Sequence, residues 1–533
     1  MDGRQIRETF LAFFEERGHK RVPSASLIPA PETGLLLTNA GMNQFIPYFL
    51  GQAQPPWPRA TSVQKCFRTG DLDNVGHTAR HCTLFEMLGN FSFADYFKRE
   101  SLAWGWELVT EGFGIDPELL WATYYELDEE TAEIWRDLGV PAERIVPRGK
   151  ADNYWSTHAA GPAGPTGEIF VDRGSAYGPE GGPAIDEERF VEIWNHVFMQ
   201  DEVDDQEVKI GDLPGKNVDT GASVERLAMV TQNAASFYET DVMAPLMEIV
   251  QSLSGKTYGA DERDDVSIRI VAEHGRATTF LIADGVLPSN EGRGYVLRRM
   301  LRRMVSHARR IGISEAFTGR LVDASVEMLG DIYPELHENH AFTTQVASSE
   351  EERFAATLRQ GMTLFETSVG DAQSSGNLSG DVAFRLHDTH GFPLELTMEL
   401  AADEGLDVDR DRFAELMQEQ RSRGRAATKK GLVSEEMLTQ VLSRVEQTEF
   451  TGYETLDQDA RIVGMIAPDE VAAEGDEVRI VLDRSPFYGE GGGQVGDQGV
   501  IKTPGGFVRI TDTQRAPGDV LVHYGTVEAG EVR

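Results

Sequence analysis

Short β-like runs separated by irregular loops constrain the fold of residues 1–240 more than any other feature. The runs cover Leu35 to Thr38, Thr61 to Phe67, Thr83 to Leu88, Glu168 to Val171 and Phe190 to Met199. Parallel strands need long crossover connections, usually helices, and regular spacers of that length do not separate these runs. The pattern therefore disfavours a doubly wound parallel sheet. It predicts an α+β fold, in which helices pack around an antiparallel sheet.

The remaining sequence changes character twice, and 533 residues are too many for one compact core. Residues 241–450 are almost wholly helical in pattern, with few prolines. Residues 451–533 turn to short alternating strands with Gly and Asp turns. We therefore expect three domains, at 1–240, 241–450 and 451–533, the last of which is unfinished where the sequence stops.

Positive charge is concentrated in one segment of an acidic chain. The formal net charge of −38 argues on its own against nucleic-acid binding, because phosphate contacts need Lys and Arg. Between Gly292 and Gly312, however, an apolar stripe at helical spacing is flanked by arginines. These are Arg298, Arg299, Arg302, Arg303, Arg309 and Arg310. The segment predicts either a helix that contacts a phosphate backbone or a solvated helix that holds acidic neighbours, and both interpretations stay open.

Two further arginines stand where an anion is easily bound. Arg68 ends a β-like run beside a loop rich in Asp and Arg, and a guanidinium there can hold a phosphate and a carboxylate together. A surface salt bridge is the plainer alternative for Arg68. Residues 217–230 predict a strand, a glycine break and a helix, with Arg226 early in the helix. A helix N-terminus with an arginine is a common anion site.

Other classes of protein fit the sequence poorly. No stretch approaches the roughly 20 apolar residues that cross a bilayer, and the N-terminus predicts an amphipathic helix, so we expect a cytoplasmic protein that binds no membrane. Two cysteines, Cys66 and Cys82, are too few for a disulfide framework. His77 and His81 have zinc-like spacing but lie in a loop, so we expect no metal site. The glycine-rich residues 489–499 lack a P-loop ending and predict turns.

Long motifs in a fixed order make the chain similar to a known family. They are TNAGMNQF (38–45), the stretch from TSVQKCFR to FSFADYF (61–97), EIWNHVFMQ (192–200), VDTGASVERL (218–227), LPSNEGRGYVLRRMLRR (287–303) and SPFYGEGGGQVGDQG (485–499). On these motifs the chain resembles the alanyl-tRNA synthetases, which are class II aminoacyl-tRNA synthetases. The resemblance implies the class II antiparallel sheet flanked by helices, a helical domain that recognises the tRNA acceptor stem, and the start of a β-barrel. The implied reaction is ATP-dependent activation of L-alanine and its transfer to the 3′ end of alanine tRNA.

The resemblance also implies roles for individual residues. Arg68 would hold the α-phosphate and the substrate carboxylate, and Arg226 would contact the γ-phosphate, so these two are the expected catalytic pair. The expected ATP-binding residues are Arg68, Phe85, Glu86, Met87 and Arg226. The expected alanine-binding residues are Trp155, Asn195, Asp219 and Gly221, with Asp219 on the ammonium and Gly221 leaving room for a methyl group. The expected tRNA-binding residues are Arg293, Arg298, Arg299, Arg302 and Arg303. Asp71 and Asp73 would help to order the substrates.

The expected ligands are ATP, Mg²⁺, L-alanine and alanine tRNA. Arginines and Mg²⁺ stabilise charge on the phosphate, so the reaction needs no protein nucleophile. In the family, zinc lies in the editing domain, and neither cysteine here has a histidine four residues on. We therefore expect that domain and its zinc to be missing, and serine and glycine to be misactivated without correction. Without the family's C-terminal oligomerisation domain, we expect a monomer.

The chain departs from the family pattern at three places. The segment GPAGPTGEIF (161–170) lacks the family's two loop cysteines, Cys82 replaces a histidine, and Ser223 replaces a glycine and would narrow the ATP site. Two alternatives stay open. One is a ligase that transfers alanine to a small acceptor, against which the arginine segment argues. The other is an inactive RNA-binding paralogue, against which Arg68, Asp219 and Arg226 argue.

Overall fold

The structure, a computed structural model, describes the chain except for residues 31–32, 157–159, 290–291, 374–375, 419–447, 453–454, 456, 468–470, 490–495, 517–519 and 533. Part of the expected helical domain and the centre of the glycine-rich segment thus lie outside the described residues. Contacts divide the chain into two compact units, Met1–Leu358 and Arg359–Arg533. The domain boundaries expected at residues 240 and 450 remain predictions.

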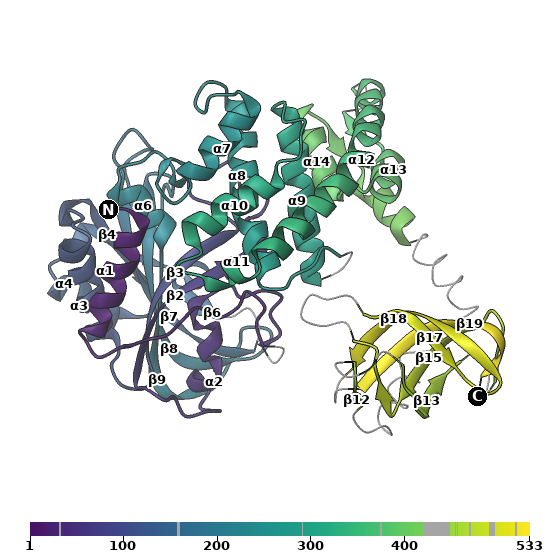
Figure 1. Ribbon diagram of the computed structural model, residues 1–533. Helices are drawn as coiled ribbons and strands as arrows, with labels where there is room; N and C mark the ends of the chain where they lie inside the picture. The colour runs from purple at the N-terminus through teal and green to yellow at the C-terminus, as the bar shows by residue number, and fades with distance from the viewer. Residues whose placement is uncertain are drawn as a thin grey trace. The chain divides into compact units, whose positions relative to one another are not determined.

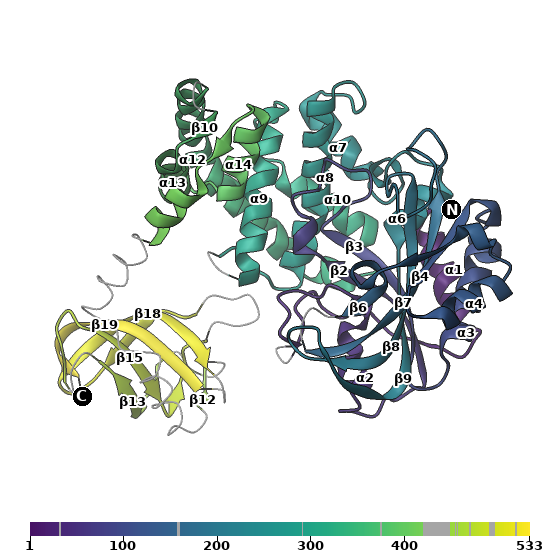
Figure 2. The ribbon, with the colours of Figure 1, turned by 180° about the vertical axis from the view of Figure 1, so that it is seen from behind.

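A nine-stranded sheet forms the centre of the first unit (Figures 1 and 2). Its strands run in the order β1-β2-β3-β9-β8-β7-β4-β5, and β6 pairs with β7. They are β1 (Lys20–Arg21), β2 (Arg59–Phe67), β3 (Leu84–Ser92), β4 (Leu120–Tyr125), β5 (Ile145–Arg148), β6 (Tyr154–Ser156), β7 (Gly161–Asp172), β8 (Phe190–Val203) and β9 (Lys209–Ser223). The pairs β1–β2 and β4–β5 are parallel and the others antiparallel. The prediction of an α+β fold is confirmed.

Helices from the first 240 residues pack on this sheet. Asp2 and Gln5 form a capping box that begins the first helix, and Ile6, Phe10 and Phe14 lie on its buried face. The helices α1, α3 and α4 contact β2, β8 and β4, respectively (Figure 1). Their bounds, with those of the short α2 and α5 and of α6, are α1 (Gly3–Glu15), α2 (Ile46–Phe49), α3 (Lys98–Glu107), α4 (Glu129–Asp137), α5 (Lys150–Asn153) and α6 (Val224–Thr231).

A group of six helices within the described residues completes the first unit. They are α7 (Ala244–Ser254), α8 (Glu262–Ala283), α9 (Gly292–Arg310), α10 (Thr318–Leu329), α11 (Pro334–Glu338) and α12 (His340–Ala372), which continues past the unit's end. Helix α8 is the centre of the group, because α7, α9, α10 and α11 all contact it (Figure 2). The apolar stripe predicted between Gly292 and Gly312 is confirmed, since Met300, Leu301 and Met304 are buried on α9.

Two local predictions were wrong. Residues Leu35 to Thr38 form no strand. The backbone of Thr38 bonds to two separate segments, since its N donates to Leu27 O and its O accepts from Phe67 N, so no strand ladder forms there. The glycine break expected before α6 is also missing. Strand β9 continues through Gly221 to Ser223, and the helix begins at the next residue.

The described part of the second unit holds helices, two two-stranded sheets (β10-β11 and β12-β16) and one six-stranded sheet. Its elements are α13 (Gly380–His390) and α14 (Leu394–Asp403), the parallel pair β10 (Asn377–Leu378) and β11 (Asp407–Val408), and β12 (Glu449–Phe450), β13 (Ile462–Ile466), β14 (Ala472–Ala473), β15 (Glu477–Leu482), β16 (Arg484–Ser485), β17 (Gly499–Lys502), β18 (Gly506–Ala516) and β19 (Val520–Val532). The order β13-β15-β19-β18-β17 is open in the described residues, so the expected barrel is not closed there. Within the described ranges, none of the helices combines the length and apolar character that crossing a membrane requires.

Candidate active site

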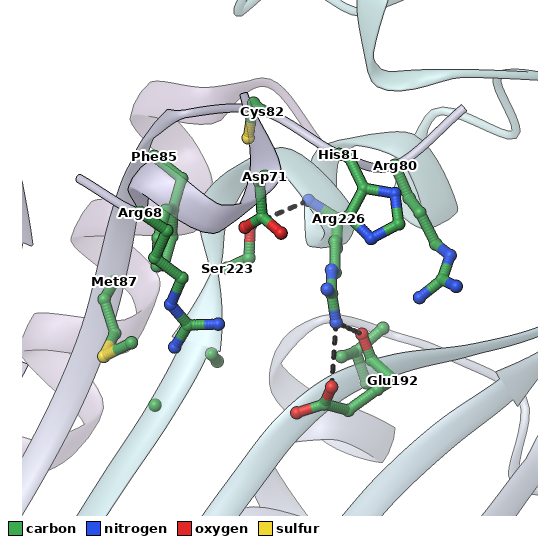
Figure 3. A pocket seen from close by; sticks show the side chains of 13 residues that line it. Arg68, Asp71, Arg80, His81, Cys82, Phe85, Met87, Glu192, Ser223 and Arg226 are labelled. Atoms are coloured by element: carbon green, nitrogen blue, oxygen red, sulfur yellow. Dashed lines mark hydrogen bonds and ion pairs between the residues drawn. The ribbon is translucent and has the colours of Figure 1, made fainter. Parts of the chain in front are cut away.

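A recess of about 520 Å³ brings together residues from three parts of the sequence (Figure 3). Arg68 follows the end of β2, Phe85 and Met87 belong to β3, and Arg226 belongs to α6. Asp71, Arg80, His81, Cys82, Glu192, Ile193, Gly221, Ala222 and Ser223 complete the lining. The two arginines expected to form a catalytic pair therefore face one cavity, although 158 positions (226 − 68) separate them in sequence.

Arg68 presents an exposed guanidinium to the recess. Its Cζ lies 5.0 Å from the centre of the Phe85 ring, and its Nε donates to Asn39 O at 3.4 Å. Among the described residues, no acidic side chain forms an ion pair with it. The Phe85 ring stabilises the guanidinium through a cation–π contact, and the N–H groups of the guanidinium remain available to an anion.

Arg226 is held in place from both ends. Its backbone N donates to Ser223 Oγ at 3.2 Å, so Ser223 is the N-cap of α6. Its Nη1 donates to the carbonyl oxygen and to Oε2 of Glu192, both at 2.9 Å. The guanidinium thus crosses from the helix to β8. Sequence reasoning missed Glu192, although an acid between the apolar residues of a strand could have marked it.

A larger cavity of about 1590 Å³ adjoins the recess. The two share Arg68, Asp71, Met87, Glu192 and Gly221 in their linings. The larger cavity adds Trp155, Asn195 and Asp219, all expected to bind alanine, and also Glu168, which was not expected. Of the residues expected to bind ATP or alanine, only Glu86 lines neither cavity.

Strand register explains why these side chains meet. Glu168 on β7 is paired with Asn195 on β8, which is paired with Gly221 on β9. Asp219 lies two residues before Gly221 and therefore on the same face of the sheet. A Cβ atom at Gly221 would lie 2.9 Å from Met87 Sδ. The glycine thus makes room for the Met87 side chain, and it also lines both cavities. Its expected place beside a substrate methyl group stays a prediction.

The larger cavity contains buried acceptor atoms without partners. Asp219 Oδ1 and Asn195 Oδ1 are both buried, and neither has a hydrogen-bond partner within the described part of the chain. Burial raises the pKa of Asp219 to about 7. Because unsatisfied buried acceptors are rare, two of them on one cavity indicate a site for a ligand that donates hydrogen bonds, such as an ammonium group.

Glu86 points away from the two cavities. It lies between Phe85 and Met87 on β3, so strand alternation places it on the opposite face. There it is 3% exposed, forms an ion pair with Arg7 and accepts from Tyr333 Oη at 2.8 Å. Its side chain has a structural role, and the period of a strand would have separated it from its two neighbours.

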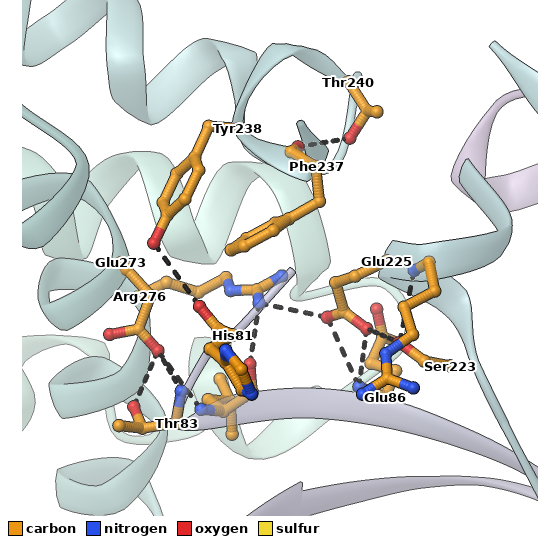
Figure 4. Close-up of polar contacts among 12 residues, drawn as sticks. His81, Thr83, Glu86, Ser223, Glu225, Phe237, Tyr238, Thr240, Glu273 and Arg276 are labelled. Carbon is orange, nitrogen blue, oxygen red and sulfur yellow. Dashed lines mark hydrogen bonds and ion pairs between the residues drawn. The ribbon is translucent and has the colours of Figure 1, made fainter. Parts of the chain in front are cut away.

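Buried polar contacts tie the site to α8 (Figure 4). Arg276 on α8 donates to Glu225 Oε1 at 3.0 Å and to Leu84 O at 2.8 Å. Glu273, one turn earlier, accepts from both the backbone N and Oγ1 of Thr83 at 2.6 Å. Glu225 precedes Arg226, and Thr83 ends the loop between β2 and β3. These contacts therefore fix two elements that carry recess residues.

The arginines of α9 contact acids and carbonyl groups within the first unit. Arg302 donates to Glu350 Oε1 at 2.7 Å, Arg298 lies 3.4 Å from the same oxygen, and Arg299 forms an ion pair with Asp73. Arg303 is 3% exposed and donates to Leu72 O at 2.9 Å and Val75 O at 3.3 Å. Arg293 is half-buried near the start of the helix. The interpretation in which the arginines hold acidic neighbours is therefore realised for Arg298, Arg299 and Arg302.

The histidines considered for zinc lie in the loop between β2 and β3. His81 lines the recess, and its Nδ1 lies 2.8 Å from Thr78 Oγ1. In the described part of the chain, His, Cys, Asp and Glu side chains form no cluster that could hold a metal ion. Cys66 and Cys82 are both buried as free thiols.

Comparison with known proteins identifies the class. The family model described as tRNA synthetases class II (A) matches residues 5–533, and the chain belongs to this family. It is 49% identical over 547 residues to the alanine--tRNA ligase of Frankia alni, and 49% identical over 553 residues to that of Streptomyces avermitilis. Both matches cover 100% of this chain and 62% of the relative's length, so the chain spans about 62% of the curated relatives it matches.

Solved structures resemble the chain more distantly. Apo histidyl-tRNA synthetase of S. aureus has a TM-score of 0.29 and 11% identity, and the match covers 47% of this chain and 75% of that one.

Proposed function

We propose that this chain activates L-alanine with ATP and transfers it to alanine tRNA. The observation that carries the proposal is the pairing of two cavities. One contains the guanidinium groups of Arg68 and Arg226, and the adjoining one contains the unpartnered oxygens of Asp219 and Asn195. A nucleotide phosphate and an amino-acid ammonium can thus be bound side by side. The alanine--tRNA ligase relatives support the choice of amino acid and acceptor.

In the proposed first step, an alanine carboxylate oxygen attacks the α-phosphorus and pyrophosphate leaves. Arg68 lines both cavities, so it can contact the attacking carboxylate and the α-phosphate together. Arg226 would contact the γ-phosphate after releasing Glu192. Met87 and Phe85 would hold the adenine, and Trp155 would form a wall beside the alanine. Positioning and charge stabilisation are sufficient for this displacement.

The residues of the recess fit a Mg²⁺ ion that arrives with ATP. Mg²⁺ is commonly held by one or two carboxylates together with substrate phosphates, and Asp71 and Glu192 are the carboxylates in the recess lining. When bound, the ion would neutralise charge on the phosphates. Glu192 would then exchange its contact with Arg226 for one with the ion.

The proposed tRNA contacts are Arg293, Arg298, Arg299 and Arg302 on α9. Arg303 is set aside, because its guanidinium is buried against the loop between β2 and β3. At Arg298 and Arg302, RNA phosphates would compete with Glu350, and at Arg299 with Asp73. We propose the cytoplasm as the place of action.

Two assays on the same preparation test this function. Alanine-dependent ATP–pyrophosphate exchange reports the first step, and charging of alanine tRNA reports the second. We expect both to occur, and exchange with serine and glycine to be weaker. Exchange without charging would favour transfer to a small acceptor. RNA binding without exchange would favour an inactive paralogue.

A further inference from the structure

Glu168 lines the larger cavity and also contacts the side chain of Asn195 there. Asn195 Nδ2 donates to Glu168 Oε1 at 2.8 Å, and Asn195 Oδ1 is the buried acceptor without a partner. An amide can be turned so that either its NH₂ group or its oxygen faces a ligand. The contact with Glu168 fixes the amide in the orientation that leaves Asn195 Oδ1 available to the ligand.

A network of buried polar groups holds Glu168 itself. Its Oε2 accepts from Thr123 Oγ1 at 2.9 Å, and Thr123 Oγ1 accepts from Asn153 Nδ2 at 2.9 Å. Asn153 Nδ2 also donates to Thr166 Oγ1 at 3.0 Å. Glu168 is 7% exposed and the other three at most 1%. The donors along this path are directed toward the carboxyl group of Glu168, so both of its oxygens are used as acceptors.

Burial shifts the ionisation of Glu168 without removing its role as an acceptor. Desolvation, together with the nearby Glu192, raises the pKa of Glu168 well above its usual range. A neutral carboxyl group still has a carbonyl oxygen that can accept from the NH₂ group of Asn195. The bond from Asn195 Nδ2 to Glu168 Oε1 is therefore compatible with both ionisation states, provided that the proton of the neutral form is on Oε2.

We propose that Glu168 is a positioning residue that determines which atom of the Asn195 amide faces the amino group of the substrate. By binding the NH₂ group of Asn195, it leaves Asn195 Oδ1 beside Asp219 Oδ1 as a second acceptor. Two acceptors favour a protonated amine over a hydroxyl or an apolar group in the substrate. This inference rests on the proposed function, because it concerns how the same cavity selects an α-amino acid.

Two variants test the role of Glu168. Glu168→Met removes the acceptor and frees the Asn195 amide to turn its NH₂ group toward the substrate ammonium. The double variant Glu168→Gln with Asn195→Asp exchanges donor and acceptor. The introduced glutamine amide would donate to one oxygen of the new carboxylate, and the other oxygen would face the ammonium. The double variant also keeps one carboxyl group in the pair, so the number of acidic groups in the site is unchanged.

Two measurements separate this role from a structural one. In pyrophosphate exchange, we expect Glu168→Met to raise the KM for alanine roughly 10- to 100-fold, as expected for a lost hydrogen bond to a charged group, and to leave the KM for ATP within about 2-fold. We expect the double variant to recover most of the loss. Calorimetry with 2-amino-1-propanol, which carries the amine without the carboxylate, should show the same order of affinities. Glu107→Met, which removes a carboxylate from α3, is the matched control and should match the wild type.

The outcomes distinguish the inference from the function. An unchanged KM for alanine in Glu168→Met would overturn the inference while the function stands. An equal loss of alanine and ATP affinity, with no recovery in the double variant, would also overturn it, because Glu168 would then only support the fold. If the wild type showed no exchange but the amine still bound in a Glu168-dependent way, the proposed function would fail and the positioning role would hold.

Discussion

The recess and the larger cavity beside it differ in whether their polar side chains already have hydrogen-bond partners. In the recess, Arg226 already has a partner in Glu192, and Arg68 is exposed over an aromatic ring. In the cavity, Asp219 and Asn195 each keep a buried oxygen without a partner among the described residues. A ligand that enters the recess must compete with an existing ion pair, whereas a donor that enters the cavity meets two acceptors that no described protein group occupies. A hydrogen bond from a charged donor to such an acceptor contributes about 1.5–3 kcal/mol. The cavity should therefore discriminate more sharply between ligands than the recess.

The largest effect should come from Arg68, which both cavities share. Arg68→Ala removes the group proposed to stabilise charge on the α-phosphate, so we expect kcat/KM for exchange to fall about 10³-fold with respect to ATP and alanine alike. Steady-state exchange kinetics would show this. A fall confined to one substrate would mean that the two cavities do not act as one site. Arg99→Ala, at an exposed ion pair on α3, is the control.

A variant of Asp219, which lines only the larger cavity, should affect alanine more than ATP. Asp219→Asn removes the charge proposed to bind the ammonium, and we expect the kcat/KM for alanine to fall roughly 100-fold while the KM for ATP changes little. Asp212→Asn changes an exposed carboxylate on the same strand and should have no effect. Equal losses for both substrates in the Asp219 variant would contradict the division between the cavities.

The raised pKa of Asp219 predicts a pH dependence. The carboxyl must be ionised to bind an ammonium, so kcat/KM for alanine should fall about 10-fold per pH unit below about 7 and level off above it. Folding has the opposite dependence. The folded-state pKa lies above the ordinary 3.8, so this group's contribution to stability is lost as pH rises from about 4 to about 7. Thermal unfolding at pH 5 and pH 8 should show that Asp219→Asn gains most, relative to the wild type, at pH 8.

The smallest effect concerns the edge of the recess. Ser223→Ala removes the N-cap of α6, and we expect about 1 kcal/mol less stability in urea unfolding. Ser223→Gly should lose only a few tenths of that amount, because glycine is tolerated at this position. If alanine and glycine lowered the stability equally, loss of the N-cap would not explain the effect of removing the hydroxyl.

The sequence predicted the residues whose chemistry is visible in a motif. Arg68, Arg226, Asn195 and Asp219 all reached the two cavities. Glu168 and Glu192 were missed, although each is an acid inside an apolar strand, which is a signal that sequence alone contains.

The remaining differences depend on partners that are distant in sequence. Asp73 and Glu350 provide the carboxylates that pair with Arg299 and Arg302 on α9. No local sequence pattern links these acids to those arginines. Likewise, the burial of Arg303 depends on the loop that packs over it. Periodicity placed the helix and its apolar stripe correctly, but it contains no information on which charged side chains a distant segment would cover.

The bonds from α8 to the loop and to α6 determine where the chain can be cut. A gene fragment that ended near residue 240 would encode Glu225 without Arg276 and Thr83 without Glu273. Removing one partner of a buried ion pair costs about 3–5 kcal/mol, a large share of the stability of an ordinary domain. A fragment of this chain that keeps the site should therefore extend at least through α8, to residue 283.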